Sequence, residues 1–331
     1  MDDTARKSFA RFAWGLTGYN LLVILWGAWV RITGSGAGCG EHWPTCHGEI
    51  IPRDAGVETI IELTHRATSG LTLIFTVVLV WKAVKVFSKG ERARNWAWIT
   101  LAFVMAEAAL GAVLVLEGLV DKNDSVQRAV VVALHLMNTN GLLGAGALSA
   151  LWATRERADA PLRVSGLSIA MLVGFVIVGM TGAITALGDT LFPVSPADDG
   201  GLIARIQEGT SVGEHFLIRL RIVHPIVASV VATGMMVLAS LFLSRTNSPI
   251  VKDAVKWVLG LVSLQVILGV VNVLLYAPGW MQLIHLLVAD ILWIATILLV
   301  VFEAEEAFRR AGPSSTSTFK GGIAEAASER S

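Results

Sequence analysis

The chain has 331 residues, of which 54% are hydrophobic and 16% are charged, and its mean hydropathy is +0.65. A soluble domain usually carries about a quarter charged residues, so this composition excludes an ordinary soluble protein and indicates a membrane-embedded one. Lys and Arg together number 26, as do Asp and Glu, so the net charge gives no reason to expect a nucleic-acid partner.

Apolar segments of membrane-spanning length recur eight times along the sequence. Each is close to the ~20 residues that a helix needs to cross a bilayer, and backbone groups in lipid must be satisfied within the segment itself. The sequence therefore predicts an all-α integral membrane protein with eight transmembrane helices. The predicted spans are residues 12–30, 60–81, 95–116, 129–152, 164–187, 216–243, 254–277 and 280–302.

Positive charges gather before the first span and in alternate connections, which predicts that both termini are cytoplasmic and that the first loop faces outside the cell membrane. The basic start followed by apolar residues is also compatible with a secretory signal peptide. The apolar run is longer than the usual ~7–15 residues of such a peptide, which favours a retained first helix. The charges are Arg6, Lys7, Arg11, Lys82, Lys85, Lys89, Arg92, Arg94, Arg155, Arg157, Arg163, Arg245, Lys252, Lys256, Arg309 and Arg310.

The two halves of the sequence show weak similarities in the same order, offset by 150–159 residues. Glu107 to Gly111 compares with Gln265 to Gly269, and Leu134-His-Leu compares with Ile284-His-Leu. Four spans return the chain to its starting side, so the halves are expected to be parallel repeats related by a pseudo-two-fold axis along the membrane normal. The predicted units are a four-helix half over 1–158, a second over 159–310, and a disordered cytoplasmic tail over 311–331.

Four histidines lie inside the predicted spans, on the second and fourth helix of each half: His65, His135, His224 and His285. An ionisable group in hydrocarbon is costly and marks a functional site by default, and neutral imidazole is a common axial ligand of haem iron. A single histidine could instead bond a neighbouring carbonyl, but four at duplicated positions favour two haem sites. Zinc is disfavoured because no Cys or carboxylate cluster completes a four-ligand site in the membrane.

Arginines near these histidines are candidate contacts for haem propionates. Arg221 precedes His224 by three residues, Arg128 precedes His135 by seven, and Arg66 adjoins the first histidine. The alternative is that these side chains reach toward the membrane interface and bind no ligand.

Glu62 lies three residues before His65, where the second half has Arg221 instead. A carboxylate beside one metal site can take protons or stabilise developing positive charge, so Glu62 is the candidate catalytic residue. The plain alternative is an acid paired with the adjacent arginine. Glu107 and Asp290 also lie within helices, either as proton relays or as packing groups.

Cys39 and Cys46 are the two cysteines of the chain and both lie in the first loop. On the oxidising side of a membrane such a pair predicts a disulfide, with a structural or a redox role. Two cysteines are too few for a structural zinc site, although two histidines are nearby.

These residues together resemble the haem A synthase family, from Gly27 to about Phe302. The carriers are residues 27–36, Gly-Ala-Trp-Val-Arg-Ile-Thr-Gly-Ser-Gly, with the two-cysteine loop, residues 62–66, Glu-Leu-Thr-His-Arg, and the other three histidines. The resemblance implies that the C8 methyl of haem O is oxidised to a formyl group by two successive hydroxylations, giving haem A for cytochrome oxidase assembly.

The resemblance also implies roles for individual residues. It implies that Glu62 is catalytic, that His65 and His135 bind the substrate haem O, and that His224 and His285 bind haem B. Cys39 and Cys46 match the disulfide of the family's first outer loop, whereas the second cysteine pair of some members is missing from 188–214. Haem O synthase, a farnesyltransferase, is the implied partner.

Two other classes share part of this pattern. A di-haem b-type electron-transfer protein that reacts with quinones would need the histidines but neither Glu62 nor the disulfide. A transporter would explain the duplication and would be colourless. The sequence leaves the electron donor or acceptor unspecified, and a homo-oligomer is compatible with it.

Overall fold

The computed structural model describes residues 3–53, 55–155, 162, 164–194, 201, 207 and 209–311, and over these residues the fold is helical. Eight spans are long and apolar enough to cross a membrane, which confirms the predicted all-α class and the count. The helices are α1 (Asp3–Ile32), α2 (Val57–Val86), α3 (Arg92–Leu116), α4 (Val126–Ala153), α5 (Gly166–Leu191), α7 (Phe216–Leu220), α8 (Val223–Arg245), α9 (Pro249–Leu274) and α10 (Gly279–Ala311), with a short 3-10 turn, η1 (Ser35–Ala37).

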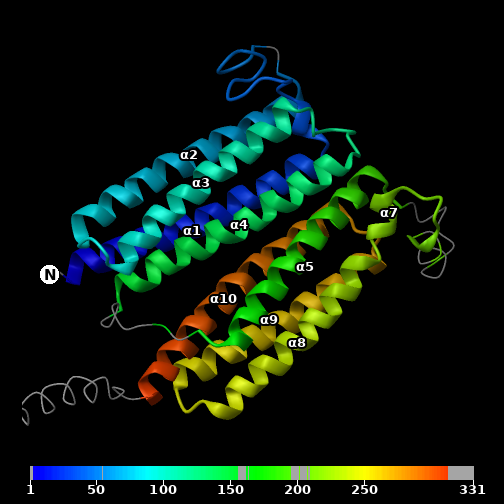
Figure 1. Cartoon of the computed structure of the whole chain (residues 1–331). Coiled ribbons are helices and arrows are strands. Elements are labelled where there is room, and N and C mark those ends of the chain that lie inside the picture. Colours follow the sequence, from blue (N-terminus) through cyan, green and yellow to red (C-terminus); the bar gives the residue numbers. More distant parts are fainter. Residues whose placement is uncertain are drawn as a thin grey trace, which may run out of the picture.

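The helices form two groups of four that lie side by side (Figure 1). In the first group α1 and α3 each pack against α2 and α4, and in the second α5 and α9 each pack against α8 and α10. The groups meet through α1, α4, α5 and α10. The duplication stays a prediction. It requires that the helices contact one another in the same order in both groups, and they do.

The centre of the molecule is the contact between α4 and α10. Their apolar membrane-spanning stretches are 56% and 44% buried within the protein, against 11–28% for the other spans. The indole N–H of Trp293 donates to the carbonyl of Asn140 (2.7 Å). A Cβ at Gly144 would lie 2.6 Å from Cδ1 of Ile297, so the glycine is what allows this close approach. Large apolar side chains elsewhere point outward, as the bilayer requires: Leu22, Trp81 and Trp257 are 65%, 60% and 70% exposed.

Arg31, near the end of α1, joins the two groups at the end that carries the first loop. Its guanidinium donates to the carbonyl of Ala186 (2.5 Å), to the hydroxyl of Thr190, and to Oε1 of Gln282 (2.9 Å). The acceptors belong to α5 and α10 of the second group. Arg31, from the segment 27–36 that leads into the first loop, therefore contacts two helices of the other half.

Helix starts follow from local sequence. The hydroxyls of Ser125 and Ser165 accept backbone N–H groups in the first turns of α4 and α5 (3.2 and 3.1 Å), and Pro249 opens α9. Several helices run beyond the predicted apolar spans, since α1 begins at Asp3 and α10 ends at Ala311. Hydropathy locates the part of a helix that lies in lipid and says nothing about its polar continuation.

The sixth span was predicted as one helix over 216–243, and this is wrong in one detail. Its helical hydrogen bonding is interrupted at Arg221 and Ile222, between α7 and α8. Pro225 explains the break, because it has no N–H to donate to the carbonyl of Arg221 and its ring crowds the preceding turn.

The proposed tail over 311–331 lies outside the described residues apart from the backbone of 311. Most of the linker at 156–163, and residues 195–200, 202–206 and 208 of the long loop, also lie outside them.

Candidate functional site

The first pair of histidines lies inside the first helix group. His65 on α2 and His135 on α4 are close enough to interact electrostatically. Nδ1 of His135 lies 2.5 Å from Oε2 of Glu107 on α3. This contact directs Nε2, the usual iron-binding nitrogen, away from α3.

The second pair lies inside the second group. His224 on α8 and His285 on α10 also interact electrostatically. Nδ1 of His224 lies 3.2 Å from the hydroxyl of Thr181, which itself donates to the carbonyl of Val178 (3.0 Å). The hydroxyl must therefore accept from Nδ1–H, which leaves Nε2 of His224 without its proton and free as a ligand. The amide Nε2 of Gln265 lies 3.1 Å from Nε2 of His285.

A glycine lies against the second-helix histidine in each half. A Cβ at Gly27 of α1 would lie 2.8 Å from Cε1 of His65, and a Cβ at Gly182 of α5 would lie 3.0 Å from Cε1 of His224. Both glycines therefore provide space for an imidazole. This role was not predictable from the sequence, because glycine occurs in membrane helices for many different reasons.

Gly27→Ala should displace the His65 imidazole and weaken haem binding in the first half. Overpacking of this kind costs about 1–3 kcal/mol. Haem content of the purified variant, measured by pyridine haemochrome, checks this. Gly18→Ala is the matched control, because nothing lies within 4 Å of a Cβ there on the same helix. Equal haem content in both variants would contradict the prediction.

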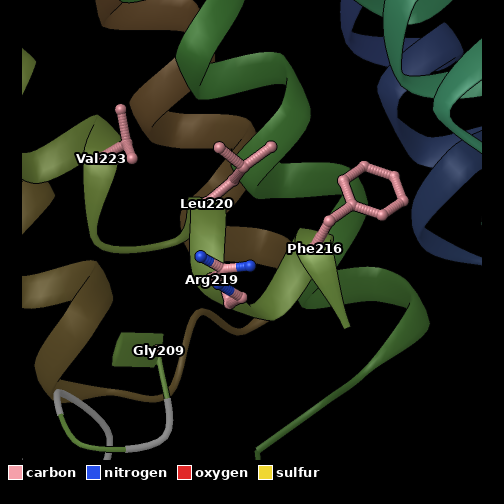
Figure 2. A pocket seen from close by; sticks show the side chains of 5 residues that line it. All are labelled: Gly209, Phe216, Arg219, Leu220 and Val223. Atoms are coloured by element: carbon pink, nitrogen blue, oxygen red, sulfur yellow. The ribbon is translucent and has the colours of Figure 1, made fainter. Parts of the chain in front are cut away.

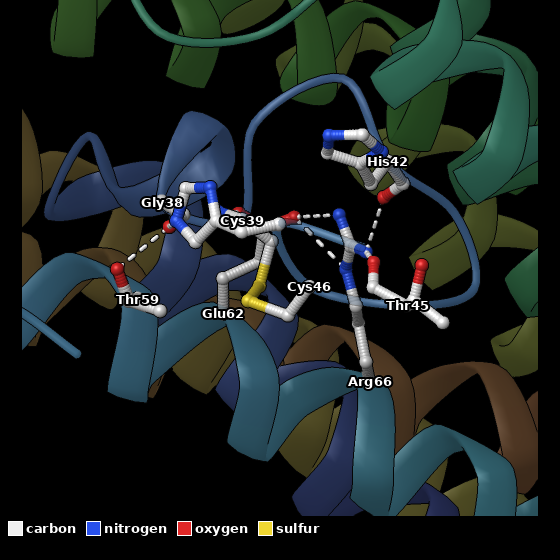
Figure 3. The surroundings of a disulfide bond; sticks show 9 residues. Gly38, Cys39, His42, Thr45, Cys46, Thr59, Glu62 and Arg66 are labelled. Atoms are coloured by element: carbon white, nitrogen blue, oxygen red, sulfur yellow. Dashed lines mark hydrogen bonds and ion pairs between the residues drawn. A yellow bond between two sulfur atoms is a disulfide. The ribbon is translucent and has the colours of Figure 1, made fainter. Parts of the chain in front are cut away.

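Glu62 lies beneath the first loop and is 4% exposed (Figure 3). One oxygen, Oε1, accepts from Nε and Nη2 of Arg66 (3.0 and 2.5 Å). The other, Oε2, accepts the backbone N–H of Cys39 (2.8 Å). The pairing with arginine that was the alternative to a catalytic role is thus present. It is compatible with that role because it fixes the orientation of the carboxylate.

The predicted disulfide between Cys39 and Cys46 is present, and both residues are fully buried. It shapes a loop that is fastened to α2 in several places (Figure 3). Nη1 of Arg66 donates to the carbonyls of His42 and Thr45 (both 2.6 Å), which are inside the disulfide ring. A Cβ at Gly38 would lie 2.5 Å from the backbone of Glu58, so glycine is required where the loop meets the start of α2.

The arginines proposed for propionates are bound to protein groups at the same end of the helices. Arg128 donates to the carbonyls of Asp121 and Asn123 (2.6 and 2.7 Å). Arg221 pairs with Asp189 (3.0 Å) and donates to the carbonyls of Gly188 (2.9 Å) and Phe192. The structure thus supplies a local partner for each guanidinium, and their contact with propionates stays a prediction.

Asp290 on α10 is 2% exposed, and its Oδ2 has no hydrogen-bond partner within the described part of the chain. Two surface pockets are formed on the second helix group. One, of about 360 Å³, follows α8 from Met236 to Leu241. The other, of about 320 Å³, places Arg219 among Phe216, Leu220 and Val223 at α7 (Figure 2). Neither pocket contains a predicted site residue.

Known proteins resemble this chain along most of its length. A Thermus thermophilus protein named Protoheme IX farnesyltransferase is 44% identical over 316 residues, which cover 94% of this chain and 50% of that protein. Bacillus cereus and Bacillus anthracis proteins named Heme A synthase are 39% identical over 115 residues, 35% of this chain and 34% of theirs. The chain thus spans half, or less, of the length of these curated relatives.

The COX15-CtaA family, described as cytochrome oxidase assembly protein, matches residues 10–297. That range runs from α1 to the middle of α10 and includes all four histidines, Glu62 and the disulfide loop. The chain belongs to this family of cytochrome oxidase assembly proteins.

Proposed function

We propose that the chain is a haem A synthase of the cell membrane, which oxidises the C8 methyl of haem O to a formyl group with electrons passed through a bound haem B. The observation that carries this proposal is an asymmetry between two similar sites. Each helix group holds a pair of histidines. Three residues before the second-helix histidine, the first group has a buried carboxylate, Glu62, whereas the second group has Arg221. The Bacillus relatives named Heme A synthase support it.

The histidines suit haem iron in both halves. Thr181 occupies Nδ1 of His224 and Glu107 occupies Nδ1 of His135, so each leaves Nε2 for a metal. Gly27 and Gly182 leave space for the imidazoles of His65 and His224. Within the described part of the chain, no three His, Cys, Asp or Glu residues gather into a site for a bare metal ion. Paired imidazoles without a third ligand fit haem, which supplies the other four ligands itself.

In this proposal residues 1–158 bind the substrate haem O through His65 and His135, and residues 159–310 bind haem B through His224 and His285. Haem B supplies one-electron transfer when it is bound. Arg66, Arg128 and Arg221 would hold the propionates. Both termini are cytoplasmic, and the disulfide loop lies outside.

The reaction needs two hydroxylations of one methyl group. In each, the carbon loses two electrons and a proton and gains a hydroxyl group from water, which releases a second proton. Loss of water from the resulting diol gives the aldehyde. Positive charge that develops on the methyl carbon is delocalised over the macrocycle. The Glu62 carboxylate stabilises this charge and accepts the released proton. Arg66 and the Cys39 amide keep the carboxylate in place, so no reorganisation is needed during the reaction.

The proposed partner is the enzyme that attaches the farnesyl group of haem O. The Thermus relative carries that activity in its name, and this chain matches half of it. The match therefore supports a link between the two steps, with this chain performing the second.

Pigment extraction separates the candidate functions. The full chain is produced in a host that makes haem O but lacks its own haem A synthase, and the membranes and the purified protein are extracted. Haem A and haem O beside haem B support the proposal. Haem B alone supports the di-haem electron carrier, and a colourless protein supports the transporter.

A further inference from the structure

Glu107 contacts His135 with a geometry that the reaction scheme above does not use. Oε2 lies 2.5 Å from Nδ1 of His135, while Oε1 accepts the hydroxyl of Thr139 (2.9 Å). Thr139 lies one turn beyond the histidine on α4, and its hydroxyl also lies 2.9 Å from the carbonyl of His135. Both oxygens of the carboxylate are therefore used, and both bind the same turn of the same helix.

The contact is fixed by the packing of α3 on α4. One turn before Glu107, the carbonyl of Phe103 accepts from Nδ2 of Asn138 (3.0 Å). A Cβ at Gly141 would lie 2.3 Å from the Phe103 ring, so the two helices meet closely at this level. The register between α3 and α4 is thus set one turn from the contact, and it places Glu107 opposite His135.

The other half has an amide where this half has a carboxylate. Gln265 of α9 also contacts His285 of α10, but its amide Nε2 lies 3.1 Å from Nε2 of that imidazole, whereas Glu107 of α3 contacts Nδ1 of His135. A carboxylate that accepts a hydrogen bond from the outer nitrogen of a metal-bound imidazole makes the imidazole a stronger electron donor. Nδ1 of His285 has no hydrogen-bond partner within the described part of the chain, so His285 receives no such donation. Stronger donation stabilises the oxidised iron and lowers its reduction potential.

We propose that Glu107 is a positioning residue that orients His135 and strengthens its bond to the iron of the substrate haem, so that this haem has a lower reduction potential than the haem of the second half. This inference rests on the proposed function, because it requires a haem at each pair. It explains the difference between Glu107 and Gln265, because electrons withdrawn in the first half would pass to a haem of higher reduction potential in the second. Packing alone would not require a carboxylate there.

The test is an anaerobic redox titration of the full chain, purified in detergent and loaded with haem O, followed by visible spectroscopy. The component missing from His135→Ala identifies the first-half haem. Glu107→Gln keeps the size and an oxygen acceptor but removes the charge. It should shift the first-half potential upward and leave the second-half potential unchanged. Glu107→Leu should weaken first-half haem binding by about 10–100-fold.

Thr139→Val provides a milder variant, because it leaves Glu107 in place and removes one of its hydrogen bonds. It should shift the first-half potential in the same direction by a smaller amount. If Glu107→Gln binds both haems and the first-half potential does not move, the inference is wrong while the proposed function stands. If Glu107→Gln loses its first-half haem, an unmoved potential in Thr139→Val decides against it. A wild-type chain that binds no haem would overturn the proposed function itself.

Discussion

Glu62→Ala should stop the formation of haem A while haem O and haem B stay bound. The side chain contacts Arg66 and the loop at Cys39 and has no role as a ligand, so both histidine pairs remain intact. A general acid or base contributes about 10²–10⁴-fold to a rate, and a loss of that size is expected. The measurement is the ratio of haem A to haem O extracted from the purified variant.

Two further variants distinguish the charge of Glu62 from its role in holding the loop. Glu62→Gln keeps an oxygen that can accept from the Cys39 amide but removes the charge, so it should lose as much activity as alanine. Thr59→Val removes a hydroxyl that donates to the carbonyl of Gly38 (2.7 Å), which loosens the same loop and leaves the carboxylate untouched. It should lose little. Full turnover in Glu62→Ala would contradict the catalytic assignment.

Each histidine pair should account for one haem, so that single substitutions divide the pigments between the halves. His65→Ala should lose haem O and keep haem B, because its iron loses an axial ligand and the other site is built from different helices. His224→Ala should lose haem B and keep haem O. The second variant should also stop turnover, since the electrons withdrawn from the substrate then have no carrier.

Haem extraction and the Soret absorbance per protein measure this outcome, and absorbance should fall by about half in each variant if the two haems absorb similarly. His42→Ala is the control: this exposed histidine of the disulfide loop contributes its backbone carbonyl to Arg66, and alanine keeps that group. A variant that loses both haems together would show that the two sites are not separate.

The helices and the candidate ligands were predictable because hydrocarbon imposes strong rules on sequence. Membrane-spanning segments must be apolar, so eight of them stand out in the sequence. Ionisable residues are rare inside such segments, so the four histidines stand out as well. The disulfide was predictable for a similar reason, since two cysteines in one outer loop have few alternatives. The alignment of Glu107 with Gln265 was also visible in the sequence, although its contact with a histidine was not.

Other features depend on which side chains face one another, and a sequence does not record that. Gly27 and Gly182 gain their meaning only from the imidazoles opposite them. Thr181 and Thr139 lie on helices other than those of the groups they bind, His224 and Glu107. The interruption of the helix before Pro225 could be expected, because proline cannot donate a backbone hydrogen bond. Hydropathy did not reveal it, because the residues on both sides are apolar and form one continuous span.

The guanidinium of Arg31 gives the two helix groups a common anchor. Its planar fork has five donors in fixed directions, and it engages α5 and α10 at once. Sliding or rotation of one group against the other would have to break several charge-assisted bonds together. If each half holds a haem, this anchor would keep the two histidine pairs at one separation, and electron transfer between them would need no movement of one helix group against the other.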